Sequence, residues 1–232
     1  FINDHDAITL KKNKFGSYSI YPSQKKENLK DDLEELKEKV LTVEQLDKLY
    51  FSNEKDKEIF YLLGLSKYKE GLFEEANKNF TEAINLDPQY LDAYFYRGNL
   101  NLEFQFFLEA IKDYDSVIQF NQEYLNAYIN RGLAKDHLGL LKESIKDFEK
   151  AIKIDPKNSL AYFNLGTSFS EQEKYEKAIE YFNEAIKLDS KKPDYFLNRG
   201  VAKYHLRKYE ESIKDFEVVI KIDPKISLAY YN

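Results

Sequence analysis

The chain has 232 residues, of which 43% are hydrophobic and 33% charged, with a formal net charge of −6 and no cysteine. This composition predicts a folded chain with a sizeable core, and it excludes disulfides, thiolate catalysis and cysteine-bound zinc. The acidic balance argues against a dominant nucleic-acid role, because neutralising phosphates needs a basic surface. No apolar run approaches the roughly 18–20 residues of a membrane span, so none is expected.

Residues 1–27 form a basic and aromatic arm, for which a short hairpin and an extended segment are both open. Apolar residues gather at 8–10 and 15–21, on either side of a Lys-Asn-Lys sequence. The arm lies either in an acidic groove of its own or a neighbouring molecule, or packs elsewhere. The sequence lacks methionine, so we expect that Phe1 is not the native start. It has no signal-peptide pattern at its beginning, and a cytoplasmic location is favoured.

Residues 28–56 are expected to form a helical hairpin. Apolar residues three or four apart predict a helix over 28–41, and Thr42 with Gln45 resembles a capping box that opens a second one. The segment does not fit the repeat that follows. We expect it to cap the exposed apolar end of the first repeat, with a degenerate repeat as the alternative.

A 34-residue repeat fills the rest of the chain. It is marked by five glycines at equal spacing: Gly64, Gly98, Gly132, Gly166 and Gly200. With each glycine at position 8, the units are 57–90, 91–124, 125–158, 159–192 and 193–226, and a truncated sixth unit covers 227–232. Such a fixed period is the signature of a repeat architecture.

Other positions of this frame recur as well. Position 4 is aromatic: Phe60, Tyr94, Tyr128, Tyr162 and Phe196. Position 20 is small: Ala76, Ala110, Ser144, Ala178 and Ser212. Position 24 is aromatic: Phe80, Tyr114, Phe148, Phe182 and Phe216. Three units have proline at position 32: Pro88, Pro156 and Pro224.

The spacing of the recurring positions predicts a pair of amphipathic helices in each unit. Positions 4, 7, 8 and 11 share one helical face, and positions 17, 20, 24 and 27 share another. Gly71 and Gly139 mark the turn between them, and Asp-Pro ends the second helix. Neither helix buries its apolar face alone, so stacked units share a continuous core. The fold class is all-α.

This pattern closely resembles the tetratricopeptide repeat family, whose W-x2-L-G-x2-Y…A-x3-F…P motif it matches at the glycine, the small residue, the aromatic and the proline over 57–232. Tyr or Phe replaces the Trp, position 11 is usually polar, and Gln122 and Ser190 replace proline, which weakens individual helix ends. The resemblance implies a right-handed α-solenoid whose first helices line a concave groove. It also implies protein or peptide binding instead of a reaction.

Positions 7 and 23 predict ion pairs within three repeats. Wherever position 7 is arginine, position 23 is aspartate: Arg97–Asp113, Arg131–Asp147 and Arg199–Asp215. The two positions face each other across an antiparallel helix pair, and Lys135 and Lys203 lie one turn beyond. A partly buried bridge that fixes helix register is the favoured interpretation, and charge presented to a ligand is the alternative.

The predicted groove carries positions 2, 5, 6 and 9 of the first helices. Position 5 supplies an apolar row: Tyr61, Phe95, Ile129, Phe163 and Leu197. Position 6 supplies a row of side-chain amides that we call the amide ladder: Asn130, Asn164 and Asn198. The amide ladder either holds a ligand backbone or serves helix stacking. Asn99 and the acidic residues Glu58, Asp92 and Asp194 complete the set. We expect an extended or helical peptide with apolar side chains and Lys or Arg. The groove lacks the cations with which some family members hold terminal carboxylates.

A second surface is predicted at the turns between the two helices of a repeat. Position 16 is apolar in three successive units, as Leu72, Phe106 and Leu140, and Phe104 and Leu138 stand nearby. These side chains either form an exposed patch for a partner or tuck between neighbouring turns.

No residue pattern points to catalysis, a cofactor or a metal. His137 and His205 share position 13 two repeats apart, too far apart to share a metal ion, and are expected to be ordinary surface residues. The sequence therefore predicts a non-catalytic binding scaffold. The alternative is the recognition domain of a larger enzyme or assembly machine. The truncated end, with Val201, Tyr204 and Phe216 on its face, predicts either further repeats or self-association, for which the arm is another candidate.

Overall fold

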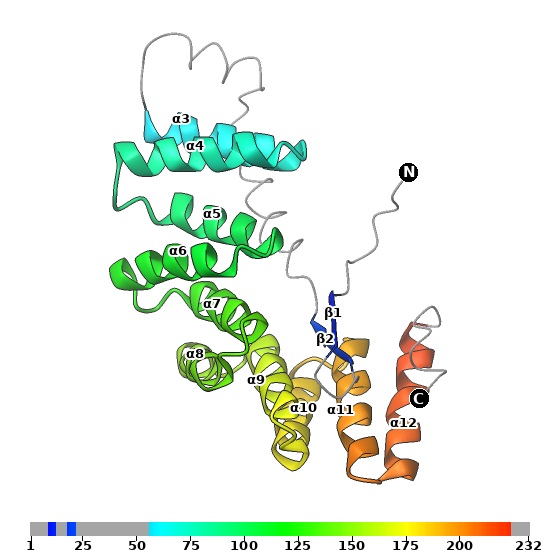
Figure 1. The fold of residues 1–232 in the computed structure, drawn as a ribbon. Coiled ribbons are helices and arrows are strands. Elements are labelled where there is room, and N and C mark those ends of the chain that lie inside the picture. Colours follow the sequence, from blue (N-terminus) through cyan, green and yellow to red (C-terminus); the bar gives the residue numbers. More distant parts are fainter. Residues whose placement is uncertain (1–8, 13–17, 22–55, 224–232) are drawn as a thin grey trace. The chain divides into compact units, whose positions relative to one another are not determined.

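A computed structural model describes residues 9–12, 18–21 and 56–223 (Figure 1). Two strands, β1 (Thr9–Lys12) and β2 (Tyr18–Tyr21), pair antiparallel, with Thr9 opposite Tyr21 and Lys12 opposite Tyr18. Over the described residues of the arm, the structure shows the strand pair expected of a hairpin, and the rest of residues 1–27 lies outside the described residues. The helical hairpin expected over 28–56 and the truncated repeat lie outside the described residues.

The helices alternate between first helices of 13 residues and second helices of 14 residues. The first helices are α3 (Lys57–Lys69), α5 (Leu91–Glu103), α7 (Leu125–His137), α9 (Ser159–Glu171) and α11 (Pro193–His205). The second helices are α4 (Phe73–Leu86), α6 (Phe107–Phe120), α8 (Leu141–Ile154), α10 (Tyr175–Leu188) and α12 (Tyr209–Ile222). The all-α repeat architecture predicted from the sequence is confirmed.

The chain divides into two compact units, which are described separately. The amino-terminal unit holds α3 to α7, and the carboxy-terminal unit holds β1, β2 and α8 to α12. Within each unit, helices that follow one another in sequence pack together, such as α3 with α4 and α10 with α11. Successive first helices also contact each other: α3 contacts α5, α5 contacts α7, and α9 contacts α11. The first helices of each unit therefore form a common layer. In the carboxy-terminal unit, strand β2 lies against α9 and α11 of that layer.

The glycine at position 8 allows close packing inside a repeat. A Cβ atom at Gly64 would lie 2.6 Å from the Phe80 ring, and one at Gly98 would lie 2.8 Å from the Tyr114 ring. Real side chains do not come so close, so these helix pairs depend on the missing Cβ. The glycine at position 8 thus packs directly against the aromatic ring at position 24.

The turn after each first helix uses a left-handed residue at position 15. Gly71 and Gly139 adopt φ of 79° and 75° there, as the sequence indicated. Gln105, Glu173 and Arg207 adopt φ of 60–63° at the same position without being glycine. This conformation costs a non-glycine residue roughly 1–2 kcal/mol, so the repeat geometry imposes the turn even where the local sequence opposes it.

The second helices end at position 30 with or without the proline at position 32. Residue 31 is Asp or Asn and extended, and its side chain accepts a hydrogen bond from the backbone two residues later. Asn121 makes this bond to the amide of Glu123 at 3.0 Å, just where Gln122 replaces proline. The helices without this proline end at the same position as those with it, because the same Asx turn forms in both. The weaker ends at Gln122 and Ser190 stay a prediction.

Candidate functional site

Buried ion pairs join the two helices of the second and fifth repeats. Arg97 Nη2 donates to Asp113 Oδ1 at 2.7 Å, and its Nε donates to Oδ2 at 3.1 Å. Arg199 Nη2 donates to Asp215 Oδ1 at 2.5 Å, and Lys203 Nζ lies 2.9 Å from the other oxygen of that carboxylate. Both aspartates are 4% exposed or less. Two predicted pairs are therefore confirmed as register-fixing bridges, since neither carboxylate is available to a ligand.

Each of the three arginines also reaches the repeat before its own. The guanidinium donates to a side-chain oxygen at position 25: Arg97 to Thr81 at 3.0 Å, Arg131 to Asp115 at 2.6 Å and Arg199 to Asn183 at 2.7 Å. These bonds were not predicted from the sequence, although a polar residue stands at position 25 before every arginine. The Arg131–Asp147 pair would join the two units and stays a prediction.

Position 5 of the first helices does not present an open apolar row. Four of its members are 2% exposed or less: Phe95, Ile129, Phe163 and Leu197. Tyr61 is half-buried. The Phe163 ring packs against Phe182 of its own repeat and Tyr195 of the next, with centroids 5.7 Å and 4.8 Å apart. The interpretation of this row as a ligand surface is wrong, because the side chains point into the layer between helices.

The amides of position 6 are buried on the first helices. Asn130 Nδ2 donates to Asn99 Oδ1 of the preceding repeat at 2.8 Å, and Asn198 Nδ2 donates to the backbone oxygen of Asp194 at 3.0 Å. Asn164 is fully buried, and Asn130 and Asn198 are 5% and 6% exposed. Two of these amides therefore use a donor within the protein itself.

Three buried amide atoms on this ladder have no hydrogen-bond partner among the described residues. They are both side-chain atoms of Asn164 and Oδ1 of Asn130. A buried donor or acceptor without a partner costs about 1–3 kcal/mol. Hydrogen bonding is thus incomplete at two of the three ladder positions.

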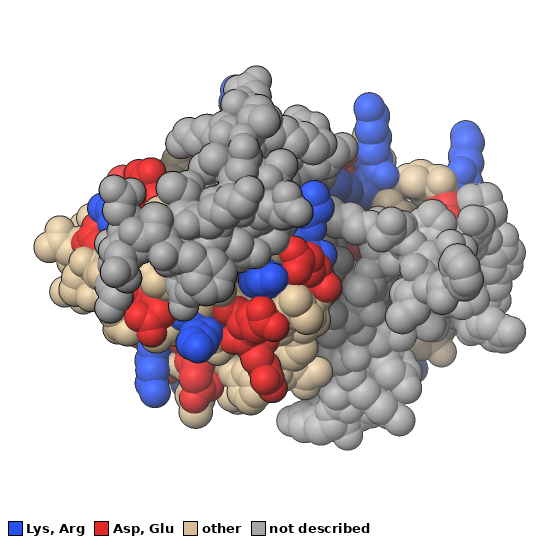
Figure 2. All heavy atoms as spheres, turned by 90° about the horizontal axis from the view of Figure 1, so that it is seen from above, with Lys and Arg blue, Asp and Glu red and all other residues tan. Residues whose placement is uncertain are grey.

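Acidic side chains rim the first-helix layer of the amino-terminal unit. Glu58 and Asp92 are exposed at position 2, whereas Asp194 of the other unit is half-buried. Glu103 accepts a hydrogen bond from the Tyr68 hydroxyl, and burial together with this carboxylate raises the pKa of Tyr68. Figure 2 shows red and blue side chains interspersed on the described part of the face it draws, without a continuous basic area.

Both described histidines stack on aromatic rings of the preceding repeat. His137 lies over Phe107 with centroids 4.7 Å apart, and His205 lies over Tyr175 at 4.6 Å. Burial lowers the pKa of His205. The stacking was not predicted from the sequence. Its signal is the aromatic residue at position 17 of the unit before, Phe107 or Tyr175.

The described residues contain no group of three or more His, Cys, Asp or Glu side chains placed to hold a metal ion. None of their helices is long and apolar enough to cross a membrane. At the end of the carboxy-terminal unit, Tyr204 is 50% exposed but Phe216 is only 4% exposed. Phe216 belongs to the core beneath Gly200 and does not contribute to a sticky end. Self-association through this end stays a prediction.

Three features define a helical repeat protein of the solenoid class, which is a protein-interaction scaffold. They are the paired helices, the close contacts at position 8 and the shared first-helix layer. Sequence models of the tetratricopeptide repeat match residues 61–123, 125–158, 159–192 and 193–226. The chain belongs to the tetratricopeptide repeat family. A comparison with curated proteins finds no match.

Solved structures with this fold include several bacterial repeat proteins. A tetratricopeptide repeat protein from Parabacteroides merdae has a TM-score of 0.71 at 20% identity, over 81% of this chain and 74% of that one. MamA from Desulfovibrio magneticus has a TM-score of 0.68 at 18% identity, over 73% and 96%. YrrB, described as having an unusual peptide-binding site, has a TM-score of 0.65 at 19% identity, over 80% and 96%. At these identities the likeness shows the fold alone.

Proposed function

We propose that the chain is a non-catalytic scaffold whose first-helix layer binds a peptide backbone through the amide ladder. The observation that carries the proposal is the set of amide atoms of Asn164 and Asn130 that lack a partner among the described residues. These atoms have no exposed surface, so a peptide reaches them only when the side chains that cover them move aside. A peptide backbone offers both donors and acceptors, so it complements a side-chain amide fully. Asn130 belongs to the amino-terminal unit and Asn164 to the carboxy-terminal unit, so the binding mode is proposed for each unit separately.

The contact of β2 with α9 and α11 supports this mode of binding. An extended segment of the same chain lies against two successive first helices, which is the geometry that a bound peptide strand would use. The structural relative YrrB is described as a peptide-binding repeat protein, which agrees with this use of the fold.

The exposed carboxylates of Glu58 and Asp92 favour peptides that contain lysine or arginine. A preference for apolar side chains has no basis at position 5, because that row is buried. The proposed ligand of the first-helix layer is therefore an extended basic peptide. It is the same ligand whether the chain acts alone or as the recognition domain of a larger enzyme or assembly machine.

The test is a peptide-library screen on the whole chain at low and high salt, repeated with Asn164→Ala and Asn130→Ala. We expect basic peptides to be selected, their affinity to fall with salt, and each substitution to weaken binding about tenfold. Asn85→Ala, at an exposed site on α4, is the matched control. Selection of acidic peptides, or affinity that neither Asn substitution changes, contradicts the proposal.

A further inference from the structure

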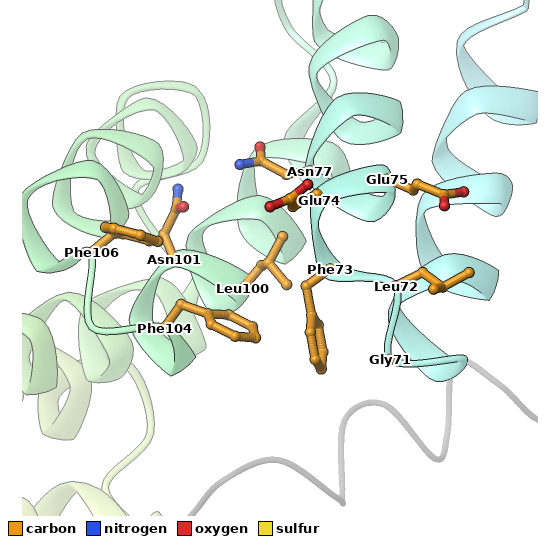
Figure 3. A pocket seen from close by; sticks show the side chains of 10 residues that line it. All are labelled: Gly71, Leu72, Phe73, Glu74, Glu75, Asn77, Leu100, Asn101, Phe104 and Phe106. Atoms are coloured by element: carbon orange, nitrogen blue, oxygen red, sulfur yellow. The ribbon is translucent and has the colours of Figure 1, made fainter.

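A cavity of about 530 Å³ opens in the amino-terminal unit, where the turn before α4 meets the turn after α5 (Figure 3). Figure 3 shows the rings of Phe73 and Phe104 next to each other, and their centroids are 4.4 Å apart. Leu100 of α5 also lines the cavity and is only 2% exposed. We call this cavity the turn pocket.

The turn pocket is bordered by apolar side chains that remain exposed. Leu72 is 41% exposed and Phe106 is 58% exposed, and both line the pocket. Of the two arrangements that the sequence left open, Leu72 and Phe106 follow the exposed patch, while Phe104 packs on Phe73 of the neighbouring turn. Large exposed apolar side chains around a cavity are typical of a surface that a partner covers.

The charged side chains that line the turn pocket are both acidic. They are Glu74 and Glu75 in the first turn of α4, and both are exposed. Glu75 has Lys67 Nζ at 3.9 Å, while the Glu74 carboxylate has no ion pair among the described residues. The pocket therefore presents negative charge beside an apolar wall and complements a cation attached to an apolar group.

The wall of the turn pocket is held in place by the buried network behind it. Asn101, which lines the pocket and is 7% exposed, donates from Nδ2 to Asp113 Oδ2 at 3.0 Å. Asp113 is in turn fixed by Arg97. A preformed wall lowers the entropic cost of binding.

The carboxy-terminal unit carries different chemistry at the equivalent turns. Position 16, which is Leu72 and Phe106 at the pocket, is Lys174 and Lys208 in the fourth and fifth repeats. Lys174 Nζ lies 5.9 Å from the Phe169 ring. The apolar turn surface is thus a property of particular repeats and does not follow from the repeat geometry. Lys174 and Lys208 therefore show which residue can replace an apolar one at position 16.

We infer that the turn pocket is a second docking surface, distinct from the first-helix layer, which takes an apolar side chain next to a lysine or arginine of a partner protein. The volume suits one or two side chains and not a whole helix. The acidic rim selects the cation. The partner is therefore a segment that projects one apolar anchor between basic residues.

The test uses two short fluorescein-labelled peptides with the same leucine positions, one with lysine and one with glutamate at the others. Fluorescence anisotropy with the whole chain measures their affinity. We expect the leucine–lysine peptide to bind at least about tenfold more tightly. Phe106→Lys, which copies Lys174, and Glu74→Gln should each weaken it about tenfold, whereas Ile213→Lys, at an exposed apolar site on α12, should not.

The same measurement separates the turn pocket from the first-helix layer. Phe106→Lys should leave the affinity of the basic peptide selected in the library screen unchanged, and circular dichroism should show that Phe106→Lys and a second variant, Leu72→Lys, remain folded. The inference is overturned if the peptides bind equally, or if both turn variants bind like the parent chain. It is also overturned if sedimentation shows a dimer that Phe106→Lys dissociates, since the occupant is then a second copy.

Discussion

The phenolic hydroxyl of Tyr114 donates a hydrogen bond to Asn99 Oδ1 at 2.8 Å, between the two helices of the second repeat. Tyr114 is fully buried, and the other units carry phenylalanine at its position: Phe80, Phe148, Phe182 and Phe216. Asn99 stands where they carry a residue without an amide: Leu65, Leu133, Thr167 and Val201. The one buried phenol at position 24 thus coincides with the one amide at position 9 that can accept its hydrogen. Asn99 Oδ1 also accepts from Asn130, which extends the contact to the third repeat.

We predict that Asn99→Leu lowers the free energy of unfolding by about 1–3 kcal/mol, because it leaves the Tyr114 hydroxyl buried without a partner. The double variant Asn99→Leu with Tyr114→Phe copies the first repeat and should be less destabilised than Asn99→Leu alone. Urea unfolding of the two single variants and the double variant measures the coupling. Additive effects would contradict the pairing.

The Arg97–Asp113 pair should behave as a buried bridge that is costly to break but replaceable as a unit. Burial raises the pKa of the Asp113 carboxyl, although Arg97 acts in the opposite direction. Asp113→Ala is expected to destabilise by about 3–5 kcal/mol, because Arg97 then lacks its counter-charge. The double variant Arg97→Leu with Asp113→Tyr copies Leu165 and Tyr181 of the fourth repeat.

We expect the double variant Arg97→Leu with Asp113→Tyr to be more stable than Asp113→Ala in thermal and urea unfolding. Glu109→Ala, at an exposed site on the same helix, is the control for loss of a carboxylate. If Asp113→Ala shifts the midpoint no more than Glu109→Ala does, the pair does not stabilise the repeat.

The left-handed turn residues predict a stabilising substitution. Gln105→Gly should raise the free energy of unfolding by about 1 kcal/mol, because glycine adopts positive φ without the steric cost that glutamine bears. Gly71→Ala is the reciprocal variant and should lower it by a similar amount, since open space surrounds the site and only backbone strain changes. Equal stabilities of Gln105→Gly and the parent chain would mean that the turn is not strained.

Acidification should lower the free energy of unfolding through His205, which stacks on Tyr175. Burial lowers the pKa of His205 in the folded chain, so the unfolded state binds its proton first as the pH falls. The contribution of neutral His205 is complete above its unfolded pKa of about 6.5 and is lost as the pH falls toward the folded value. Between pH 7 and pH 5, His205→Gln should therefore lose less stability than the parent chain. Parallel pH profiles of the two proteins would show that His205 does not contribute.

The repeat frame could be predicted from the sequence because its signals are local and recur. Gly98 and Tyr114 hold the same positions as Gly64 and Phe80, so one rule places every helix pair. The second bond of Arg97, to Thr81, crosses between repeats and depends on how far one stacks over the next, which periodicity does not specify. The burial of Phe163 was missed for the same reason, since a helical wheel gives its direction but not the neighbouring Tyr195 that covers it.

The left-handed turns of Glu173 and Arg207 show the opposite case, in which the fold overrides local preference. Their side chains give no signal for positive φ, and only the equivalence with Gly71 and Gly139 reveals it. The turn pocket was foreseen only as an apolar cluster, because its volume arises where the turns of two repeats meet.

The central claim, that the first-helix layer binds a peptide, is tested most directly by site-specific photocrosslinking. A benzophenone amino acid replaces either Asp92, exposed on the first helix α5, or Lys112, exposed on the second helix α6. Each protein is irradiated with the tightest basic peptide from the library screen. The account predicts crosslinking from position 92, competed by unlabelled peptide, and none from position 112. Crosslinking from position 112 alone, or equally from both, would contradict it.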